Sequence, residues 1–294
     1  SFTISLFIPT LILYIRFLLD NKIHSKEQLK KLVNEKIPFI AEIPFISNTE
    51  DLQKICSSES RTALSESIRM LVANLSFSFF EKTVKSKVIL VTSSIKGEGK
   101  TLVSTNLASI LSSKSKVILI GADLRNPQIH KSLNVDKERL GLSDYIYSNS
   151  VKWKDCLINE GNLDIMLSGT IPPNPTELLG SEKFKSFIKL LKNNYDYIII
   201  DSAPCLLVSD TLEIADSVDY SVYIVRSSFS NNNISNFIND LFGNNKLPKM
   251  NLVLNSVGNS SYYGYRYGYQ YGYQYGYQYN YGYGYGYNAQ NEKS

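Results

Sequence analysis

The chain has 294 residues, a length that accommodates one large α/β domain with appended segments. Its 43% hydrophobic and 20% charged residues are ordinary for a folded protein, and a net charge of +4 gives no indication of a nucleic-acid partner. Cys56, Cys156 and Cys205 are too far apart for a metal-binding or disulfide motif, which argues against a disulfide scaffold and suits a reducing cytosol.

The first twenty residues are almost entirely apolar. About 20 such residues are needed to cross a bilayer. Several lysines follow between residues 22 and 31, as the positive-inside rule requires for a cytoplasmic C-terminal side. We therefore expect residues 1–20 to be the end of a transmembrane helix in a chain truncated at its N-terminus. A buried helix broken at Pro9 is the alternative.

We interpret residues 21–59 as a cytoplasmic linker. Its first part, SKEQLKKLVNEKI, has apolar residues at helical spacing, and Ser25 is placed to cap that helix. Its second part, IPFIAEIPFI, is predicted to be extended and punctuated by proline. A second amphipathic helix is expected over residues 60–83, immediately before the first strong strand.

Beyond this helix, short runs rich in Val and Ile alternate with helical stretches. Six runs are predicted as strands: KVILVT, KVILIG, LDIML, DYIII, YSVYIVR and NLVLNS. They are apolar without alternation, which is typical of strands buried on both faces of a parallel sheet. Helices are expected near 101–113, 176–193 and 231–242. Residues 60–257 are thus predicted to form a doubly wound α/β domain, a mostly parallel sheet flanked by helices with ligands at the strands' carboxyl ends.

The segment VILVTSSIKGEGKTLVSTNLA combines a strand, a glycine-containing turn and a helix, the context of a phosphate-binding P-loop. We expect Lys100 to reach the β- and γ-phosphates and the Thr101 hydroxyl to bind Mg²⁺. Backbone N–H groups approach the phosphates at the glycines and at the helix N-terminus. The residues expected to contact the nucleotide here are Ser94, Gly97, Glu98, Gly99, Lys100, Thr101 and Leu102. The sequence therefore predicts a site for ATP and Mg²⁺.

Two positions in the loop are unusual. Ser94 stands where the first glycine of G-x-x-x-x-G-K-[ST] is usual. Lys96 lies one residue after the place where P-loop ATPases of the chromosome- and septum-partitioning type carry a second lysine. We therefore interpret Lys96 as a surface lysine near the phosphates, without an assigned role.

Acidic residues follow two further buried strands. Asp123 and Arg125 end KVILIGADLR, and Asp201 follows YDYIII, where a Walker B carboxylate would hold Mg²⁺. An aspartate at a strand end is also a common cap or turn residue. Beside a P-loop in the same sheet, however, Asp123 and Asp201 are expected metal ligands. Arg125 either holds Asp123 or phosphate or forms a surface salt bridge, and Asn255 either contacts adenine or caps a turn.

The composition changes completely over residues 258–294. Fourteen of the 21 tyrosines lie between residues 262 and 287, and no aliphatic residue accompanies them to build a core. We predict a disordered, low-complexity tail. An adhesive, self-associating segment is the alternative.

In these motifs the sequence resembles the bacterial tyrosine kinases of capsule and exopolysaccharide systems, over residues 1 to about 257. The shared segments are ESIRMLVANL, TSSIKGEGKTLVSTNLA, ILIGADLRNPQIH, GLSDYI, SGTIPPNPTELLGSEKF and DYIIIDSAPCLLVSD. The resemblance implies a polysaccharide co-polymerase anchored in the bacterial inner membrane, whose cytoplasmic domain transfers the ATP γ-phosphate to tyrosines. Lys100, Asp123 and Asp201 are then the expected catalytic residues.

The resemblance also implies that subunits form a ring in which one tail enters its neighbour's site, with polysaccharide-export proteins and a tyrosine phosphatase as partners. The tyrosines expected to accept phosphate are Tyr263, Tyr265, Tyr267, Tyr269, Tyr271, Tyr273, Tyr275, Tyr277, Tyr279, Tyr281, Tyr283, Tyr285 and Tyr287.

Two departures from the family pattern stand out. The second acidic element usually reads D-x-D, but here Gly121 replaces its first acid, leaving Asp123 as base or metal ligand. If this costs activity, Gly121→Asp should raise the rate. The family's E-x-x-R-x-x-R interface helix has Glu66 and Arg69, followed by Val72 in place of the last arginine.

Two other functions fit part of the pattern. Gly121 favours a nucleotide-binding scaffold that regulates polysaccharide chain length without transferring phosphate. A partitioning-type ATPase is the other, and the position of Lys96, the N-terminal apolar segment and the tyrosine tail argue against it.

Overall fold

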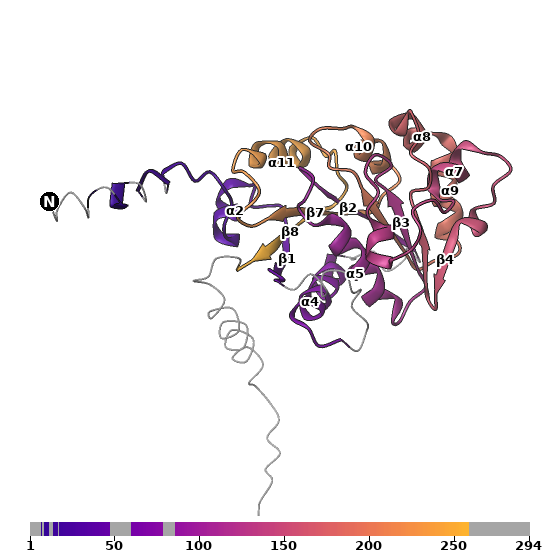
Figure 1. The fold of residues 1–294 in the computed structure, drawn as a ribbon, viewed down its shortest axis with the longest axis horizontal. Helices are drawn as coiled ribbons and strands as arrows, with labels where there is room; N and C mark the ends of the chain where they lie inside the picture. Colours follow the sequence, from indigo (N-terminus) through magenta and orange to yellow (C-terminus); the bar gives the residue numbers. More distant parts are fainter. Residues whose placement is uncertain are drawn as a thin grey trace, which may run out of the picture. The chain divides into compact units, whose positions relative to one another are not determined.

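The computed structural model describes residues 7, 9–11, 14–16, 18–47, 60–78 and 86–258 (Figure 1). The candidate phosphoacceptor tyrosines of the tail and Cys56 lie outside the described residues, as does part of the apolar segment over residues 1–20. Where the chain is described, it contains no helix with the length and apolar character needed to cross a bilayer.

Eight strands form one sheet in the order β1-β8-β7-β2-β6-β3-β5-β4. Every neighbouring pair is parallel except β4 with β5. The strands are β1 (Phe39–Pro44), β2 (Lys87–Ser93), β3 (Val117–Ala122), β4 (Leu157–Glu160), β5 (Leu163–Met166), β6 (Tyr197–Ser202), β7 (Tyr220–Arg226) and β8 (Met250–Val257). The predicted mostly parallel sheet is confirmed, and the six predicted strands are all present in it.

Helices cover both faces of the sheet, with α4 and α5 on one side and α10 and α11 on the other (Figure 1). The helices are α2 (Lys26–Leu32), α4 (Ala63–Ser78), α5 (Lys100–Ser112), α6 (Ile129–Leu133), α7 (Leu142–Tyr147), α8 (Pro175–Gly180), α9 (Glu182–Lys192), α10 (Asp210–Ala215) and α11 (Ile234–Gly243), with a 3-10 turn η1 (Trp153–Cys156). The helix expected over 176–193 is two helices, because the Ser181 hydroxyl accepts a hydrogen bond from Phe184 N and starts a new one.

The main core lies between the sheet and the α4–α5 layer. Leu71 of α4 and Leu107 of α5 pack with Val91, Leu119 and Ile199 of three neighbouring strands, all of them buried. Full burial of one such aliphatic side chain contributes roughly 1.5–3 kcal/mol. This layer fixes α5, and with it the loop between β2 and α5, against the centre of the sheet.

Part of the segment interpreted as a linker is built into the sheet. The helix predicted after Ser25 is confirmed, and the Ser25 side chain accepts a hydrogen bond from Gln28 N. Strand β1 then pairs in parallel with β8 at the edge of the sheet, and Asn74 of α4 donates to the Ile40 carbonyl at 2.6 Å. The prolines that indicated a linker stand just before the strand and at its last residue, and an edge strand tolerates proline at such positions.

We predict that β1 contributes to the stability of the domain. Ile43 is fully buried against the core, so Ile43→Ala should lower the free energy of unfolding by about 2 to 5 kcal/mol. Ile171, which is 49% exposed, supplies the matched control: Ile171→Ala should change it by less than about 1 kcal/mol. Urea denaturation of both variants is the measurement, and equal effects would show that β1 does not belong to the folded core.

Candidate functional site

The sheet brings the predicted site residues to one edge because its parallel strands end there together. Strand β2 lies between β6 and β7, so the chain leaves β2 for β3 on one side and later forms β7 on the other. Ligands of open α/β sheets bind at the carboxyl ends of the strands at such a reversal. The loop after β2, Asp123 after β3, Asp201 in β6 and Asn255 in β8 all lie at this end.

The loop before α5 has the backbone geometry of an anion-binding turn. Gly97 and Gly99 have φ of 93° and 99°, a left-handed conformation that glycine adopts without strain. A Cβ on Gly99 would lie 2.1 Å from Asn255 Nδ2, so the close packing of the loop on β8 also requires glycine. Helix α5 begins at Lys100, and its free N–H groups and dipole favour negative charge in front of it.

Lys100, Thr101 and Asp201 meet at this helix start. The Thr101 hydroxyl donates to Asp201 Oδ2 at 2.7 Å, and both Lys100 and Asp201 are buried. Within the described part of the chain, Asp201 Oδ1 has no hydrogen-bond partner. Burial raises the pKa of Asp201 to about 6, although the Thr101 hydrogen bond and the Lys100 charge favour the ionised form.

These oxygens fit a magnesium ion. The unpartnered Asp201 Oδ1 and the Thr101 hydroxyl are hard donors, which Mg²⁺ prefers. No three His, Cys, Asp or Glu side chains gather as a metal site among the residues described. A cation held here would therefore share its coordination shell with phosphate oxygens and water, as Mg²⁺ does in nucleotide sites.

Asp123 lies close enough to the other charges to interact with them. It is partly buried, its Oδ1 accepts from Asn126 N at 2.9 Å, and burial raises its pKa while Lys100 opposes the rise. Arg125 bonds to Asp210 of α10, with Nε 2.7 Å from Oδ2 and Nη2 3.0 Å from Oδ1. The structure therefore pairs Arg125 with Asp210 in an ion pair.

Asn255 and Glu98 stabilise the loop between β2 and α5 through buried hydrogen bonds. Asn255 is buried, and its Nδ2 donates to the Glu98 carbonyl at 2.9 Å. The buried Glu98 carboxylate accepts from Ile95 N at 2.8 Å and from the Ser230 hydroxyl. We expected Glu98 to contact the nucleotide, but its side chain is buried and accepts hydrogen bonds from its own loop and from Ser230. No local sequence signal distinguishes that orientation from a solvent-facing one.

The unusual Ser94 is accommodated by a tyrosine from β7. Its hydroxyl lies 2.8 Å from the Tyr223 hydroxyl, and both residues are fully buried. Cys205 packs beside them, and burial raises the pKa of its thiol to about 11, which keeps it protonated at neutral pH. Lys96 is exposed, and Leu102 packs partly buried against the core.

The end of β7 and the loop after it connect the P-loop to the segment before α2. Arg226 Nη1 donates to the Gly97 carbonyl at 2.8 Å, and Ser230 holds Glu98 from the same loop. Ile23 pairs its main chain with that loop, its N–H donating to the Ser230 carbonyl at 3.0 Å and its carbonyl accepting from Ser228 N at 2.7 Å.

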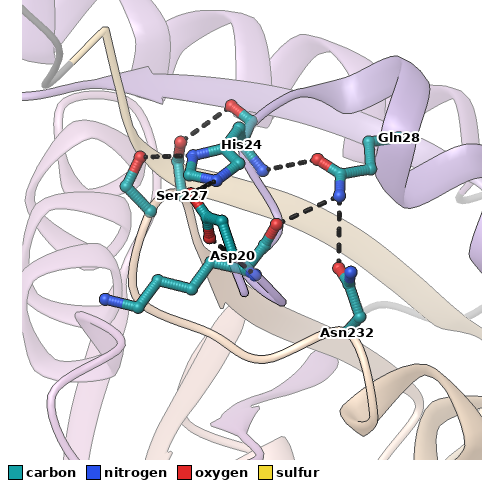
Figure 2. A network of polar contacts seen from close by, with 7 residues as sticks. Asp20, His24, Gln28, Ser227 and Asn232 are labelled. Carbon is teal, nitrogen blue, oxygen red and sulfur yellow. Dashed lines mark hydrogen bonds and ion pairs between the residues drawn. The ribbon is translucent and has the colours of Figure 1, made fainter. Parts of the chain in front are cut away.

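Side-chain hydrogen bonds between the same two segments add to this main-chain pairing, as Figure 2 shows. The Ser227 hydroxyl donates to the His24 carbonyl at 2.9 Å, and Gln28 Nε2 donates to Asn232 Oδ1 at 3.3 Å. The His24 ring also lies 2.9 Å from Asp20 Oδ2. Sequence reasoning missed this support, because the two segments are about two hundred residues apart.

The residues of the interface motif in α4 have partners within the subunit. Arg69 forms an ion pair with Glu66 one turn earlier in the same helix. Val72 packs partly buried against the core of the domain. The position at which the family pattern has its last arginine is therefore used for packing.

We predict a pH dependence that belongs to Asp201. In the folded chain Asp201 is protonated below about pH 6. In the unfolded chain it is protonated only below its ordinary pKa of 3.8. The wild type should therefore gain stability relative to Asp201→Asn as the pH falls from 7.5 to 5, by about 1 to 1.5 kcal/mol. Paired urea titrations without nucleotide measure this, and a stability difference independent of pH would contradict the burial of a charged carboxylate.

Comparison with known proteins identifies a matching family and several similar kinases. Residues 86–252 match the model of a family described as AAA domain. Tyrosine-protein kinase YwqD of Bacillus subtilis (strain 168) is 34% identical over 175 residues, which are 59% of this chain and 73% of that protein. Putative tyrosine-protein kinase CapB of Staphylococcus aureus is 32% identical over 214 residues, 70% of this chain and 91% of that protein.

A solved structure covers most of this chain. The kinase domain of Escherichia coli tyrosine kinase ETK has a TM-score of 0.69 and 25% identity, covering 81% of this chain and 97% of that chain. The match to tyrosine-protein kinase etk of Escherichia coli (strain K12) spans only 22% of that longer protein. This chain belongs to the AAA domain family and, within it, to the bacterial tyrosine-protein kinases.

Proposed function

We propose that this chain binds Mg·ATP and transfers the γ-phosphate to tyrosines of its own C-terminal tail, as a regulator of capsule or exopolysaccharide synthesis and export. The observation that carries the proposal is the buried Asp201 carboxylate beside Lys100. One of its oxygens accepts a hydrogen bond from the Thr101 hydroxyl, and the other has no partner among the described residues. The same chain carries an acceptor-rich tail of alternating tyrosines.

Phosphoryl transfer depends mainly on positioning and on neutralising charge. Lys100 would stabilise charge on the β- and γ-phosphates, and the backbone N–H groups of the loop would bind the remaining oxygens. Thr101 and Asp201 would hold Mg²⁺, with Asp123 as a further ligand or as the base. When bound, the ion neutralises charge that develops between the β- and γ-phosphates.

The acceptor tyrosine must lose its phenolic proton, whose unperturbed pKa is near 10. Burial raises the pKa of Asp123, which makes its carboxylate a better proton acceptor than an exposed aspartate. We therefore assign Asp123 the role of general base. The tail follows β8, whose carboxyl end belongs to the edge of the sheet that carries the site.

The remaining assignments follow the family resemblance. Residues 1–20 would anchor the protein in the bacterial inner membrane, with residues 60–257 as the kinase domain in the cytoplasm and residues 258–294 as the substrate tail. Subunits would present tails to one another, and the partners would be the polysaccharide-export machinery and a tyrosine phosphatase. The pairing of Arg69 with Glu66 and the packing of Val72 against the core favour a weaker ring than the family motif would give.

A second candidate is a nucleotide-binding scaffold that controls polysaccharide chain length without transferring phosphate. Gly121 in place of a carboxylate favours it, because one group expected to assist the tyrosine hydroxyl is absent. Both candidates require nucleotide binding, so phosphotyrosine formation distinguishes them.

The phosphate role of Lys100 can be tested against a neighbouring lysine. Lys100→Met should weaken Mg·ATP binding by roughly 10- to 100-fold, since a charged hydrogen bond is worth about 1.5–3 kcal/mol. The exposed Lys96 supplies the control, and Lys96→Met should change the affinity by less than about threefold. Calorimetric titration gives both values. Equal losses at the two positions would contradict the assignment.

The tail can be tested by removing it. A protein ending at Gly258 should bind Mg·ATP as tightly as the full chain but take up almost no phosphotyrosine, because the acceptors are gone. Tyr275→Phe in the full chain should leave incorporation nearly unchanged, because twelve equivalent acceptors remain among the odd positions from 263 to 287. Phosphate counting after incubation with Mg·ATP measures both. Undiminished phosphotyrosine in the shortened protein would identify another substrate.

A further inference from the structure

The space beside Gly121 is filled by Ser168, which lies just after the neighbouring strand β5. Gly121 is paired with Asp201 across β3 and β6, at the level of the candidate metal ligand. A Cβ added to Gly121 would lie 2.8 Å from Ser168 Oγ, 3.0 Å from Ser168 N and 3.3 Å from Ile129 Cδ1. Gly121 is not among the residues with positive φ, so here glycine is required by space and not by backbone conformation.

Ser168 is held firmly in that place. It follows β5, the strand next to β3, and it is 4% exposed. Its carbonyl accepts from Ser143 N at 3.0 Å, and the preceding carbonyl of Leu167 accepts from Leu142 N at 2.8 Å. The start of α7 thus fixes the backbone on which Ser168 stands, so a larger residue at position 121 cannot simply displace it.

The Ser168 hydroxyl also reaches the segment that carries the candidate base. Its Oγ donates to the main-chain carbonyl of Asp123 at 3.3 Å. Asp123 Oδ1 accepts from Asn126 N, so the turn is held at the side chain by its own backbone and at the carbonyl by Ser168. These two contacts fix how far the Asp123 carboxylate extends from the end of β3.

We propose that Ser168 is a positioning residue for Asp123 and that residues 121 and 168 form a coupled pair, with serine occupying the space that a carboxylate at position 121 would need. The catalytic half of this proposal rests on the proposed function, since it assumes that Asp123 acts on the substrate. It changes one expectation from the sequence: Gly121→Asp alone should lower activity, because the added side chain meets Ser168.

The first test concerns positioning. Ser168→Ala should lower kcat for phosphotyrosine formation by about 2- to 10-fold, the value of one net hydrogen bond. The melting temperature should fall by only a few degrees, as in the control below, and the ATP affinity and KM for ATP should stay close to wild type. Ser143→Ala is the matched control, because it removes a buried serine hydroxyl that bonds to the Thr170 carbonyl instead. Equal loss of kcat in both variants, or none in Ser168→Ala, would overturn the positioning role.

The second test concerns coupling. Gly121→Asp is compared in the wild-type and Ser168→Gly backgrounds, with Gly121→Ala as a milder change that adds only the Cβ. Each substitution at position 121 should reduce melting temperature and kcat less when Ser168 Oγ is absent, so the two positions are not additive. Effects that combine independently would contradict the coupling.

The two proposals fail in different ways. If every protein, including the wild type, binds Mg·ATP but forms no phosphotyrosine, the proposed function is wrong and with it the positioning of a catalytic group. The melting temperatures of the same variants would still decide whether residues 121 and 168 compete for one space.

Discussion

The site depends on the buried carboxylate of Asp201 and its hydrogen bond from Thr101. This bond joins β6 to the first turn of α5 and places the P-loop opposite the acidic strand ends. A buried charge without full compensation destabilises a fold, and burial raises the pKa of Asp201 to about 6. The buried Asp201 charge lies where a cation bound with nucleotide would neutralise it. Such a placement is expected of a binding site and not of a structural core.

Local patterns predicted much of this arrangement. Continuous apolar strands, the glycine turn and the strand-end aspartates each lie within a short segment, so the sheet and the convergence of Lys100, Thr101 and Asp201 were predictable. The bond of the inward-facing Glu98 to Ser230, the use of residues 39–44 as a strand, and the contact of Ser168 with the Asp123 carbonyl were not. Each depends on residues distant in sequence, and no local periodicity encodes such contacts.

The two departures from the family pattern have a common physical form. Val72 packs against the core where an arginine would face a neighbour, and Ser168 fills the space beside Gly121 where a carboxylate would stand. In both places a charged group is absent and an uncharged residue packs there instead. At position 121 the packing is tight, so restoring the family carboxylate requires changing Ser168 as well.

Transfer of phosphate from ATP to the tyrosine tail can be followed by phosphopeptide mass spectrometry of the purified full chain after incubation with Mg²⁺ and ATP labelled with ¹⁸O in the γ-phosphate. We expect labelled phosphate on several tyrosines between residues 263 and 287, and none when Mg²⁺ is withheld. Labelled inorganic phosphate without labelled tyrosine would contradict this transfer, as would label confined to tyrosines outside the tail.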